Sequence, residues 1–335
     1  MSRTANRAFS SQNEAFIKQG WYPSPTTGNA VDLSSLVSNA KRLVASYDLA
    51  AIDNVLSTTV SSSNPNKPTS VTVTDEASSA AAERLHAEGA PRIVVLNFAS
   101  ARNPGGGYLG GAQAQEEDIC RSSALYTTLL QAPDHYAAHQ RADGRYSHRM
   151  IYSPSVPVYR TSGGDLLPQP YTVDFVTSPA PNYGALAKNN PGLVGQVFQI
   201  MRERAARVLA LCAFHGAQTL VLGAWGCGVF RNSPTDVAKV FHDLLKPGGR
   251  FHGRFDSVVF AIYDRSPKQE VMRAFNAEFK TTAPLRDSPK KDHGRSLSDS
   301  NSGSRADGPE HDKTAPVDGQ AKITSFFQRA PPAES

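Results

Sequence analysis

The chain has 335 residues, of which 39% are hydrophobic, and it carries a formal net charge of +5. This length allows one large or two modest domains with a sizeable core, and the scattered basic residues do not by themselves indicate nucleic-acid binding. Three cysteines without a CxxC pair, Cys120, Cys212 and Cys227, argue against a disulfide framework and a structural zinc site and favour a reducing compartment. The N-terminus has no apolar core, and no apolar run approaches the roughly 20 residues that span a bilayer, so we expect a soluble intracellular protein without a signal peptide.

The N-terminal part of the chain predicts two helices, then a strand, a helix and a second strand. A capping-box spacing from Ser11 to Glu14 opens a short predicted helix that ends near Gly20. An apolar stripe at helical spacing over 33–47 predicts a helix that packs on the core, and 71–74 and 76–88 are typical of a strand and an alanine-rich helix. The run IVVLNF at 93–98 is almost continuously apolar, which predicts a strand buried on both faces of a sheet.

The stretch NPGGGYLGGAQAQEE at 103–117 joins that strand to the next predicted helix. Apolar residues at helical spacing over 119–130 place Gln115, Glu116, Glu117 and Asp118 at or near the N-terminus of this helix. Open α/β sheets bind ligands at such strand-to-helix loops, and glycines let the backbone approach phosphate oxygens with its N–H groups. The loop lacks the Lys-Ser or Lys-Thr of a P-loop and the GxGxxG fingerprint; the competing interpretation is a surface turn followed by acids that complement the helix dipole.

The middle of the chain, 131–169, is irregular and contains His135, His139 and His148 in polar sequence. Their spacing does not resemble that of metal ligands, so we expect solvated surface histidines. Short strands are predicted at 150–152 and 156–160, and a strand at 171–177 leads into the loop SPAPNY at 178–183. Asn182 in that loop either hydrogen-bonds a ligand or caps a turn.

Helices and strands alternate through the rest of the predicted domain. A long amphipathic helix at 195–214 carries Arg202, Arg204 and Arg207 on faces that we expect to be solvated. A buried strand at 219–224 runs into a further glycine-rich loop, WGCGVF, whose Cys227 has no histidine at a recognisable triad position, which argues against a thiol nucleophile. A helix at 236–245, a strand at 257–263 and a helix at 267–279 complete the order.

This order predicts an α/β fold, a three-layer α/β/α domain with a mixed, largely parallel sheet. We assign the domain to residues 1–280, with 1–70 as an N-terminal helical extension packed on it. From about residue 281, Ser, Asp, Gly, Pro and Lys replace apolar residues, and such a composition cannot bury enough surface to fold. The segment 281–335 is therefore predicted to be a disordered C-terminal tail.

The glycine-rich stretch also resembles the signature of a known family. GGG at 105–107, a short spacer and Gln115-Glu116-Glu117 are similar to the motif of poly(ADP-ribose) glycohydrolases of the compact bacterial and fungal type, which are built on a macrodomain. LNFASARNPGGG, SPAPNY and the run LGAWGCGVFRNSP at 222–234 resemble the same family. The resemblance keeps a similar order over residues 5–280 and includes nothing in the tail.

The resemblance implies a macrodomain-like fold and hydrolysis of the ribose–ribose O-glycosidic bonds of poly(ADP-ribose), which releases ADP-ribose without a metal or another cofactor. Such a bond breaks through an oxocarbenium-like transition state that needs a proton for the leaving oxygen and an activated water, and a carboxyl group suits both tasks. By the resemblance, Glu117 is the acid and then the base, and Glu116 orients the ribose hydroxyls. The expected substrate-binding residues are Asn97, Asn103, Gly105, Gly106, Gly107, Gln115, Asn182, Gly226, Cys227, Gly228, Val229 and Phe230, with Phe230 on the distal ribose.

Two other functions are compatible with the same loops. A macrodomain can act as a reader that binds ADP-ribose without cleaving it, and a hydrolase of this kind can remove a single ADP-ribose from protein or nucleic acid. Only a hydrolase requires Glu116 and Glu117, which favours the enzyme. The expected partners are poly(ADP-ribose) and ADP-ribosylated proteins, and we expect a monomer.

The predicted tail contains GQAKITSFFQR, in which Gln320, Ile323, Phe326 and Phe327 stand in polar surroundings. Their spacing resembles the motif by which replication and repair proteins dock on the sliding clamp, PCNA, where one helical turn presents the apolar anchors. A chance apolar cluster is the alternative. The motif predicts a nuclear protein at replication or repair sites, and the basic segment 288–295 is a weak indication of nuclear import.

Overall fold

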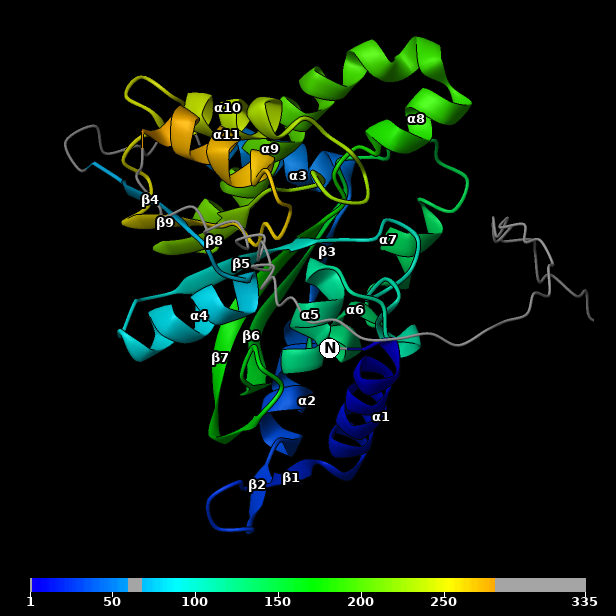
Figure 1. Cartoon of the computed structure of the whole chain (residues 1–335), viewed down its shortest axis with the longest axis vertical. Coiled ribbons are helices and arrows are strands. Elements are labelled where there is room, and N and C mark those ends of the chain that lie inside the picture. The colour runs from blue at the N-terminus through cyan, green and yellow to red at the C-terminus, as the bar shows by residue number, and fades with distance from the viewer. Residues whose placement is uncertain (1, 60–67, 281–335) are drawn as a thin grey trace, which may run out of the picture. The chain divides into compact units, whose positions relative to one another are not determined.

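The computed structural model describes residues 2–59 and 68–280 (Figure 1). The strands of its main sheet are β3 (Ala45–Tyr47), β4 (Ser70–Thr74), β5 (Ile93–Phe98), β6 (Met150–Arg160), β7 (Leu166–Ser178), β8 (Thr219–Gly223) and β9 (Ser257–Ala261). They lie in the order β3-β6-β7-β5-β8-β9-β4. Neighbours from β7 to β4 are parallel, whereas β6 pairs antiparallel with β7, and β3 pairs antiparallel with β6. A small second sheet pairs β1 (Trp21–Pro23) with β2 (Ala30–Asp32).

Helices cover both faces of the main sheet (Figure 1). They are α1 (Arg3–Gln19), α2 (Ser34–Leu43), α3 (Leu49–Thr59), α4 (Ser78–Ala87), α5 (Gln115–Ser122), α6 (Leu125–Leu129), α7 (Pro133–Ala137), α8 (Tyr183–Asn189), α9 (Val197–Phe214), α10 (Pro234–Leu245) and α11 (Glu270–Phe279), with short 3-10 turns η2 (Tyr108–Gly110) and η3 (Pro191–Gln196). Side chains of α3, α9, α10 and α11 pack with Leu96 and Leu220 on one face. Those of α1, α2, α4, α5 and α6 pack with Val95 and Val221 on the other. The predicted three-layer α/β/α fold with a mixed, largely parallel sheet is confirmed.

The central strand begins and ends at the predicted residues. All residues of β5 from Ile93 to Asn97 are buried, because β7 and β8 flank the strand and helices cover both of its faces. A continuous apolar run is the expected sequence for such a position. The carboxyl end of β5 therefore opens directly onto the glycine-rich loop.

The first helix begins earlier than its predicted capping box. Ser2 caps α1 by accepting a hydrogen bond from the N–H of Ala5 at 3.2 Å, so the spacing from Ser11 to Glu14 lies inside the helix. The predicted end near Gly20 is confirmed, since Gly20 has φ +83° and closes the helix in the left-handed region. This is the C-terminal position at which glycine is most favoured.

Three further predictions of where elements begin and end are wrong. The helix predicted over 33–47 stops at Leu43 and is followed by β3, and α3 was not predicted at all. The helical stripe over 119–130 breaks between α5 and α6, where Ser123 forms an isolated bridge with Val158. The two pieces at 150–152 and 156–160 form one strand, β6, with a register shift near Ser155, whose φ is +51°.

No helix among the described residues combines the length and the apolarity that a bilayer crossing requires. The predicted disordered tail, the clamp motif at 320–327 and the basic segment 288–295 lie outside the described residues.

Candidate active site

The two glutamates of the glycine-rich stretch are placed by the amide of Gln115 at the start of α5. The Gln115 side chain donates to the Leu96 carbonyl at 2.7 Å and accepts from the Phe98 N–H at 2.9 Å. Because β8 pairs with β5 only as far as Val95, the amide meets backbone groups that β8 leaves unpaired. It also donates to Ser78 at 3.1 Å. Its polar atoms are therefore used within the chain, and its predicted contact with substrate stays a prediction.

Glu116 is buried directly above the end of β5. One of its carboxyl oxygens accepts from Asn97 Nδ2 at 3.2 Å and the other from the Ser100 N–H at 2.6 Å. Burial raises the pKa of Glu116 to about 8, and the neighbouring charge of Glu117 adds to the effect of burial while the two hydrogen bonds oppose it. Asn97 is itself held by Thr177 at 3.2 Å, so it supports the carboxyl group from the floor of the site.

Glu117 is held by one carboxyl oxygen and leaves the other free. Its Oε1 accepts from the Gly107 N–H at 2.8 Å, whereas its Oε2 is buried and has no hydrogen-bond partner among the described residues. Buried polar atoms are nearly always paired in native proteins, so an unpaired oxygen at a strand end is a candidate for contact with a ligand. This arrangement can present one oriented carboxyl oxygen to a reacting group.

The packing of the two glutamates against the loop leaves no room for a side chain at Gly106, whether or not a ligand is bound. Gly106 has φ +59°, and a Cβ there would lie 2.5 Å from Glu117 Oε1 and 3.0 Å from Glu116 Oε2. The Gly106 N–H donates to the Asn103 carbonyl, and that of Gly107 to Glu117. The expectation that these N–H groups point at phosphate oxygens is therefore not met at Gly106 and Gly107. The Asn103 side chain is exposed at the start of the loop.

Helix α1 braces the far side of this loop, a feature that was not predicted. Asn6, Ser10 and Asn13 are buried and reach backbone carbonyls of the loop and of α5. Ser10 donates to the Tyr108 carbonyl at 2.8 Å, and Asn13 donates to that of Arg121 at 2.6 Å. The three polar residues recur at helical spacing, so the buried face of α1 recognises backbone in addition to the apolar contact that Phe16 makes with the core.

The loops after β7 and β8 meet beside the carboxylates. Asn182 caps α8 by accepting from the Ala185 N–H at 2.9 Å, which is the turn-capping alternative for this residue. Asn232 donates to the carbonyls of Pro181 and Gly226 at 2.9 and 3.2 Å and so ties the two loops together. Gly226 has φ +75°, and a Cβ there would overlap the Asn232 amide.

The tip of the loop after β8 is open to solvent. Gly228 and Val229 are exposed, with Val229 80% accessible, while Phe230 is half-buried and packs on the core. The N–H of Gly184 donates to the Phe230 carbonyl at 2.9 Å. Burial raises the pKa of the Cys227 thiol to about 12, which is consistent with the expectation that it is not a nucleophile.

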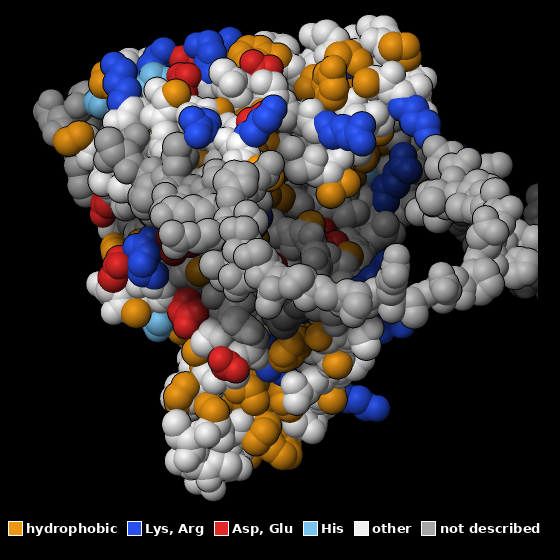
Figure 2. Space-filling model, in the orientation of Figure 1, with side chains coloured by type: hydrophobic (Ala, Val, Ile, Leu, Met, Phe, Trp, Pro, Cys, Tyr) orange, Lys and Arg blue, Asp and Glu red, His pale blue; other side chains and the backbone are white. Residues whose placement is uncertain are grey.

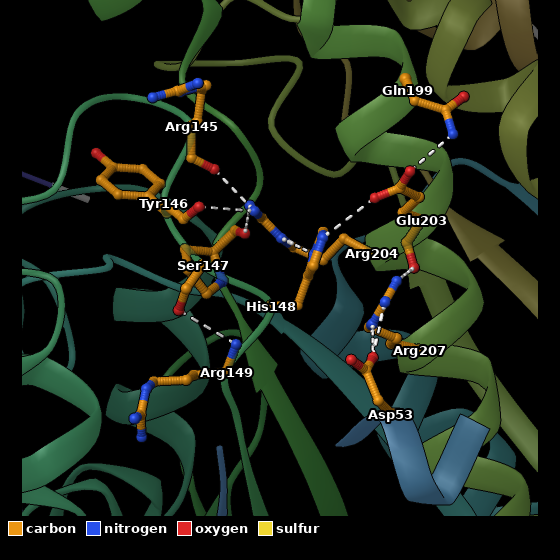
Figure 3. Close-up of polar contacts among 11 residues, drawn as sticks. Asp53, Arg145, Tyr146, Ser147, His148, Arg149, Gln199, Glu203, Arg204 and Arg207 are labelled. Carbon is orange, nitrogen blue, oxygen red and sulfur yellow. Dashed lines mark hydrogen bonds and ion pairs between the residues drawn. The ribbon is translucent and has the colours of Figure 1, made fainter. Parts of the chain in front are cut away.

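Arg204 is fully buried, so the predicted solvated arginine face of α9 is wrong at this position (Figure 3). Its guanidinium donates to the carbonyls of Pro179 at 2.8 Å and Arg145 at 2.7 Å and to His148 Nδ1 at 3.2 Å. These bonds join the loop after β7 to the segment before β6. Burial lowers the pKa of Arg204 to about 9, with a further contribution from the charge of Arg207.

The predicted surface histidines are also buried or partly buried. His135 and His139 are inaccessible, and His139 accepts from the Ser147 N–H at 3.2 Å through Nε2. Burial lowers the pKa of His135 to about 3, so the ring is neutral at physiological pH. Within residues 2–59 and 68–280, no group of three His, Cys, Asp or Glu side chains is arranged to hold a metal ion.

The raised pKa of Glu116 predicts a pH-dependent stability effect. The folded chain keeps this proton up to about pH 8, whereas an unfolded chain releases it above its ordinary value of 4.5, so the wild type loses stability as pH rises between these values. Glu116→Gln cannot ionise and should gain stability relative to the wild type by about 1.4 kcal/mol per pH unit across this window. Urea unfolding at several pH values checks this, with the exposed Glu270→Gln as control; a constant difference would contradict it.

The contact between Gly106 and the carboxylates predicts a steep cost for any side chain there. Gly106→Ala should lower the free energy of unfolding by about 2 kcal/mol or more, because the left-handed backbone alone costs roughly 1–2 kcal/mol and the Cβ also collides with Glu117. Gly192→Ala is the control, since a Cβ at Gly192 has open space. Equal losses for both variants in denaturant unfolding would show that the loop is not packed as described.

Comparisons with known proteins were made for both sequence and structure. Residues 10–161 match a family described as the microbial-type PARG, catalytic domain. A search of curated protein sequences gave no match. The structure of the poly(ADP-ribose) glycohydrolase from Thermomonospora curvata is 42% identical, with a TM-score of 0.79, and the match covers 82% of this chain and 100% of that chain.

Two structures with bound ligands are similar as well. The T. curvata glycohydrolase bound to the inhibitor ADP-HPD matches with a TM-score of 0.76 at 42% identity over 82% of this chain and 100% of that chain. The poly(ADP-ribose) glycohydrolase from Deinococcus radiodurans in complex with ADP-ribose is 43% identical, covers 73% of this chain and 97% of that chain, and has a TM-score of 0.69. Identity at this level over nearly the whole length of both relatives shows that the chain belongs to the poly(ADP-ribose) glycohydrolase family.

Proposed function

We propose that this protein hydrolyses the ribose–ribose O-glycosidic bonds of poly(ADP-ribose) and releases ADP-ribose. The observation that carries the proposal is the buried Glu117 carboxyl, whose Oε1 is fixed by the Gly107 N–H while Oε2 has no partner among the described residues. The carboxyl lies at the carboxyl ends of parallel strands, where α/β sheets bind ligands. The D. radiodurans relative in complex with ADP-ribose and the T. curvata relative bound to ADP-HPD support an ADP-ribose unit as the ligand.

Glu117 supplies the acid and then the base in this proposal. As the glycosidic bond breaks, the Glu117 proton goes to the leaving ribose oxygen and positive charge develops on the anomeric carbon. Water then adds to that carbon, and its proton returns to Glu117. The Gly107 N–H holds Oε1 throughout, so that Oε2 keeps its direction toward the reacting atoms.

Glu116 and the two glycine-rich loops bind and orient the substrate. The Glu116 oxygens accept hydrogen bonds from Asn97 and Ser100, and in this proposal the carboxyl group also contacts a ribose hydroxyl. Gly228 and Val229 are exposed at the tip of the loop, which supports their N–H groups as the ligands of the diphosphate in this proposal, with Phe230 against the distal ribose. Asn97 and Gln115 act through the carboxylates and the strand end that they hold.

Replacement of Glu117 by glutamine should reduce catalysis and leave substrate binding unchanged. Glu117→Gln is nearly isosteric but cannot cycle a proton, so turnover of polymer should fall by about 100-fold or more. Affinity for ADP-ribose should persist, because Gln keeps an oxygen for the Gly107 N–H. Released ADP-ribose and calorimetry with ADP-ribose give the two readings. A variant that hydrolyses polymer at the wild-type rate rules out this role for Glu117.

A panel of substrates distinguishes the alternatives for the wild-type protein. Polymer, mono-ADP-ribosylated protein and ADP-ribosylated DNA are incubated with the enzyme, and released ADP-ribose is measured. Release from polymer supports the proposal. Binding to polymer without release would instead indicate a reader, and release from the mono-ADP-ribosylated substrates alone would indicate a mono-ADP-ribosyl hydrolase.

We also propose that the protein acts as a monomer in the nucleus and binds the sliding clamp through residues 320–327, which lie outside the described residues. The spacing of Gln320, Ile323, Phe326 and Phe327 supports this, since one helical turn gathers the three apolar anchors. Phe326→Ala combined with Phe327→Ala should abolish clamp binding in a pull-down and leave hydrolysis of free polymer intact. Equal recovery of the clamp by both proteins would refute the proposal.

A further inference from the structure

A second hollow lies on the other side of the loop that follows β8. Its volume is about 510 Å3, and it is bounded by α8, η3, the first turns of α9 and the start of α10. Residues that line it include Tyr183, Phe198, Met201, Arg231, Asn232 and Asp236. Figure 2 shows hydrophobic side chains beside Lys and Arg side chains over the region of α8. Neither Glu116 nor Glu117 lines this hollow.

The lining residues combine aromatic faces with a cation, Arg231, that has no carboxylate partner in the part of the chain that the structure describes. Tyr183 and Phe198 are each 39% exposed, and such rings can stack on a nucleobase. Arg231 forms no ion pair with a carboxylate among the described residues. It also has φ +59°, in the left-handed region that L residues adopt uncommonly, as do five other non-glycine residues of the described chain. A guanidinium without a carboxylate partner is suited to an anionic group such as a phosphate.

Asn232 adds a buried acceptor to the same wall. The residue is 4% exposed, and its Nδ2 is used by the carbonyls of Pro181 and Gly226, but its Oδ1 has no hydrogen-bond partner among the described residues. A ligand amino or hydroxyl group can supply the missing donor. The carboxylate of Asp236, at the start of α10, is a second acceptor for sugar hydroxyls or an amino group.

The hollow shares a wall with the site of the proposed function. Arg231 and Asn232 follow Phe230 directly in the chain, and the Gly184 N–H at the start of α8 donates to the Phe230 carbonyl. Phe230 is the residue assigned to the distal ribose, whose anomeric carbon is bonded to the next unit of the polymer. That next unit is therefore bonded to the ribose that Phe230 borders in the proposed function.

We propose that the hollow binds the adenosine diphosphate portion of the polymer unit that leaves when the bond is cleaved. The adenine stacks on Tyr183 and Phe198, Asn232 accepts a hydrogen bond from its amino or sugar groups, and Arg231 pairs with the diphosphate. This inference rests on the proposed function. If the hollow has this role, its residues increase the affinity for polymer over that for free ADP-ribose without contact with the terminal ADP-ribose unit.

The test compares polymer with free ADP-ribose in single variants of the hollow. Phe198→Ala should raise KM for polymer roughly 5- to 100-fold, the range for loss of one base–aromatic stack, with little change in kcat and none in ADP-ribose affinity. Phe214→Ala is the matched control, because Phe214 lies on the same helix, is 56% exposed and does not line the hollow. It should behave as the wild type.

A second variant tests the charge independently of any effect on packing. Arg231→Gly removes the guanidinium and places at a positive φ the residue that tolerates it best, so the variant should fold. Its KM for polymer should be higher than that of the wild type and should change less with salt concentration. Wild-type KM for polymer in both Phe198→Ala and Arg231→Gly would overturn the inference. Equal losses of affinity for polymer and for ADP-ribose would also overturn it, because the hollow would then serve the terminal unit. Failure of the wild type to release ADP-ribose from polymer would instead reject the proposed function.

Discussion

The site depends on the close packing of a buried carboxylate pair against a glycine backbone. The Gly107 N–H holds one oxygen of Glu117, the Ser100 N–H holds one oxygen of Glu116, and a Cβ at Gly106 would lie within 2.5 Å of Glu117. The two halves of this arrangement depend on each other, because the carboxyl groups use the loop's N–H donors and the loop has no room for a side chain at Gly106. The rest of the fold supports this contact: β5 and Gln115 from below, and α1 from outside.

The burial that positions these acids also acts against folding. Burial raises the pKa of Glu116 to about 8 and also raises that of Asp118, which is paired with Ser79. Ionising such groups in a site with little water costs free energy that an unfolded chain does not bear. A chain selected for stability alone would not bury two consecutive acids, Glu116 and Glu117, beside the partly exposed Asp118, and strain of this kind is characteristic of functional sites.

The sequence predicted the layers of the fold because the central strands and the main helices follow simple periodicities. The strand at 93–98 was located to the residue and the start of α5 within the predicted range 115–118, and the carboxylates and glycines come together as the resemblance implied. The contacts of Gln115 were not predictable, because they depend on where β8 stops pairing with β5. That is a tertiary property with no local signal.

Some residues whose burial was not predicted do lie at the spacing of a buried helical face, but their polar or charged side chains indicated exposure to solvent. Arg204 lies three residues after Met201 and four before Val208, so it shares their buried face, yet its charge indicated solvent. Asn6, Ser10 and Asn13 likewise form a polar stripe whose partners are distant carbonyls. The burial of His135 depends on packing between segments far apart in sequence, which no local pattern reports.

The central claim is that Glu117 Oε2 is the atom that meets the scissile bond. A crystal structure of Glu117→Gln with a short poly(ADP-ribose) chain tests it most directly, because the substrate should bind and remain uncleaved. The account predicts that the side-chain atom in the place of Oε2 lies within about 3–3.5 Å of the glycosidic oxygen, the separation expected of reacting groups. A bound chain whose glycosidic oxygen is far from residue 117 would contradict the account.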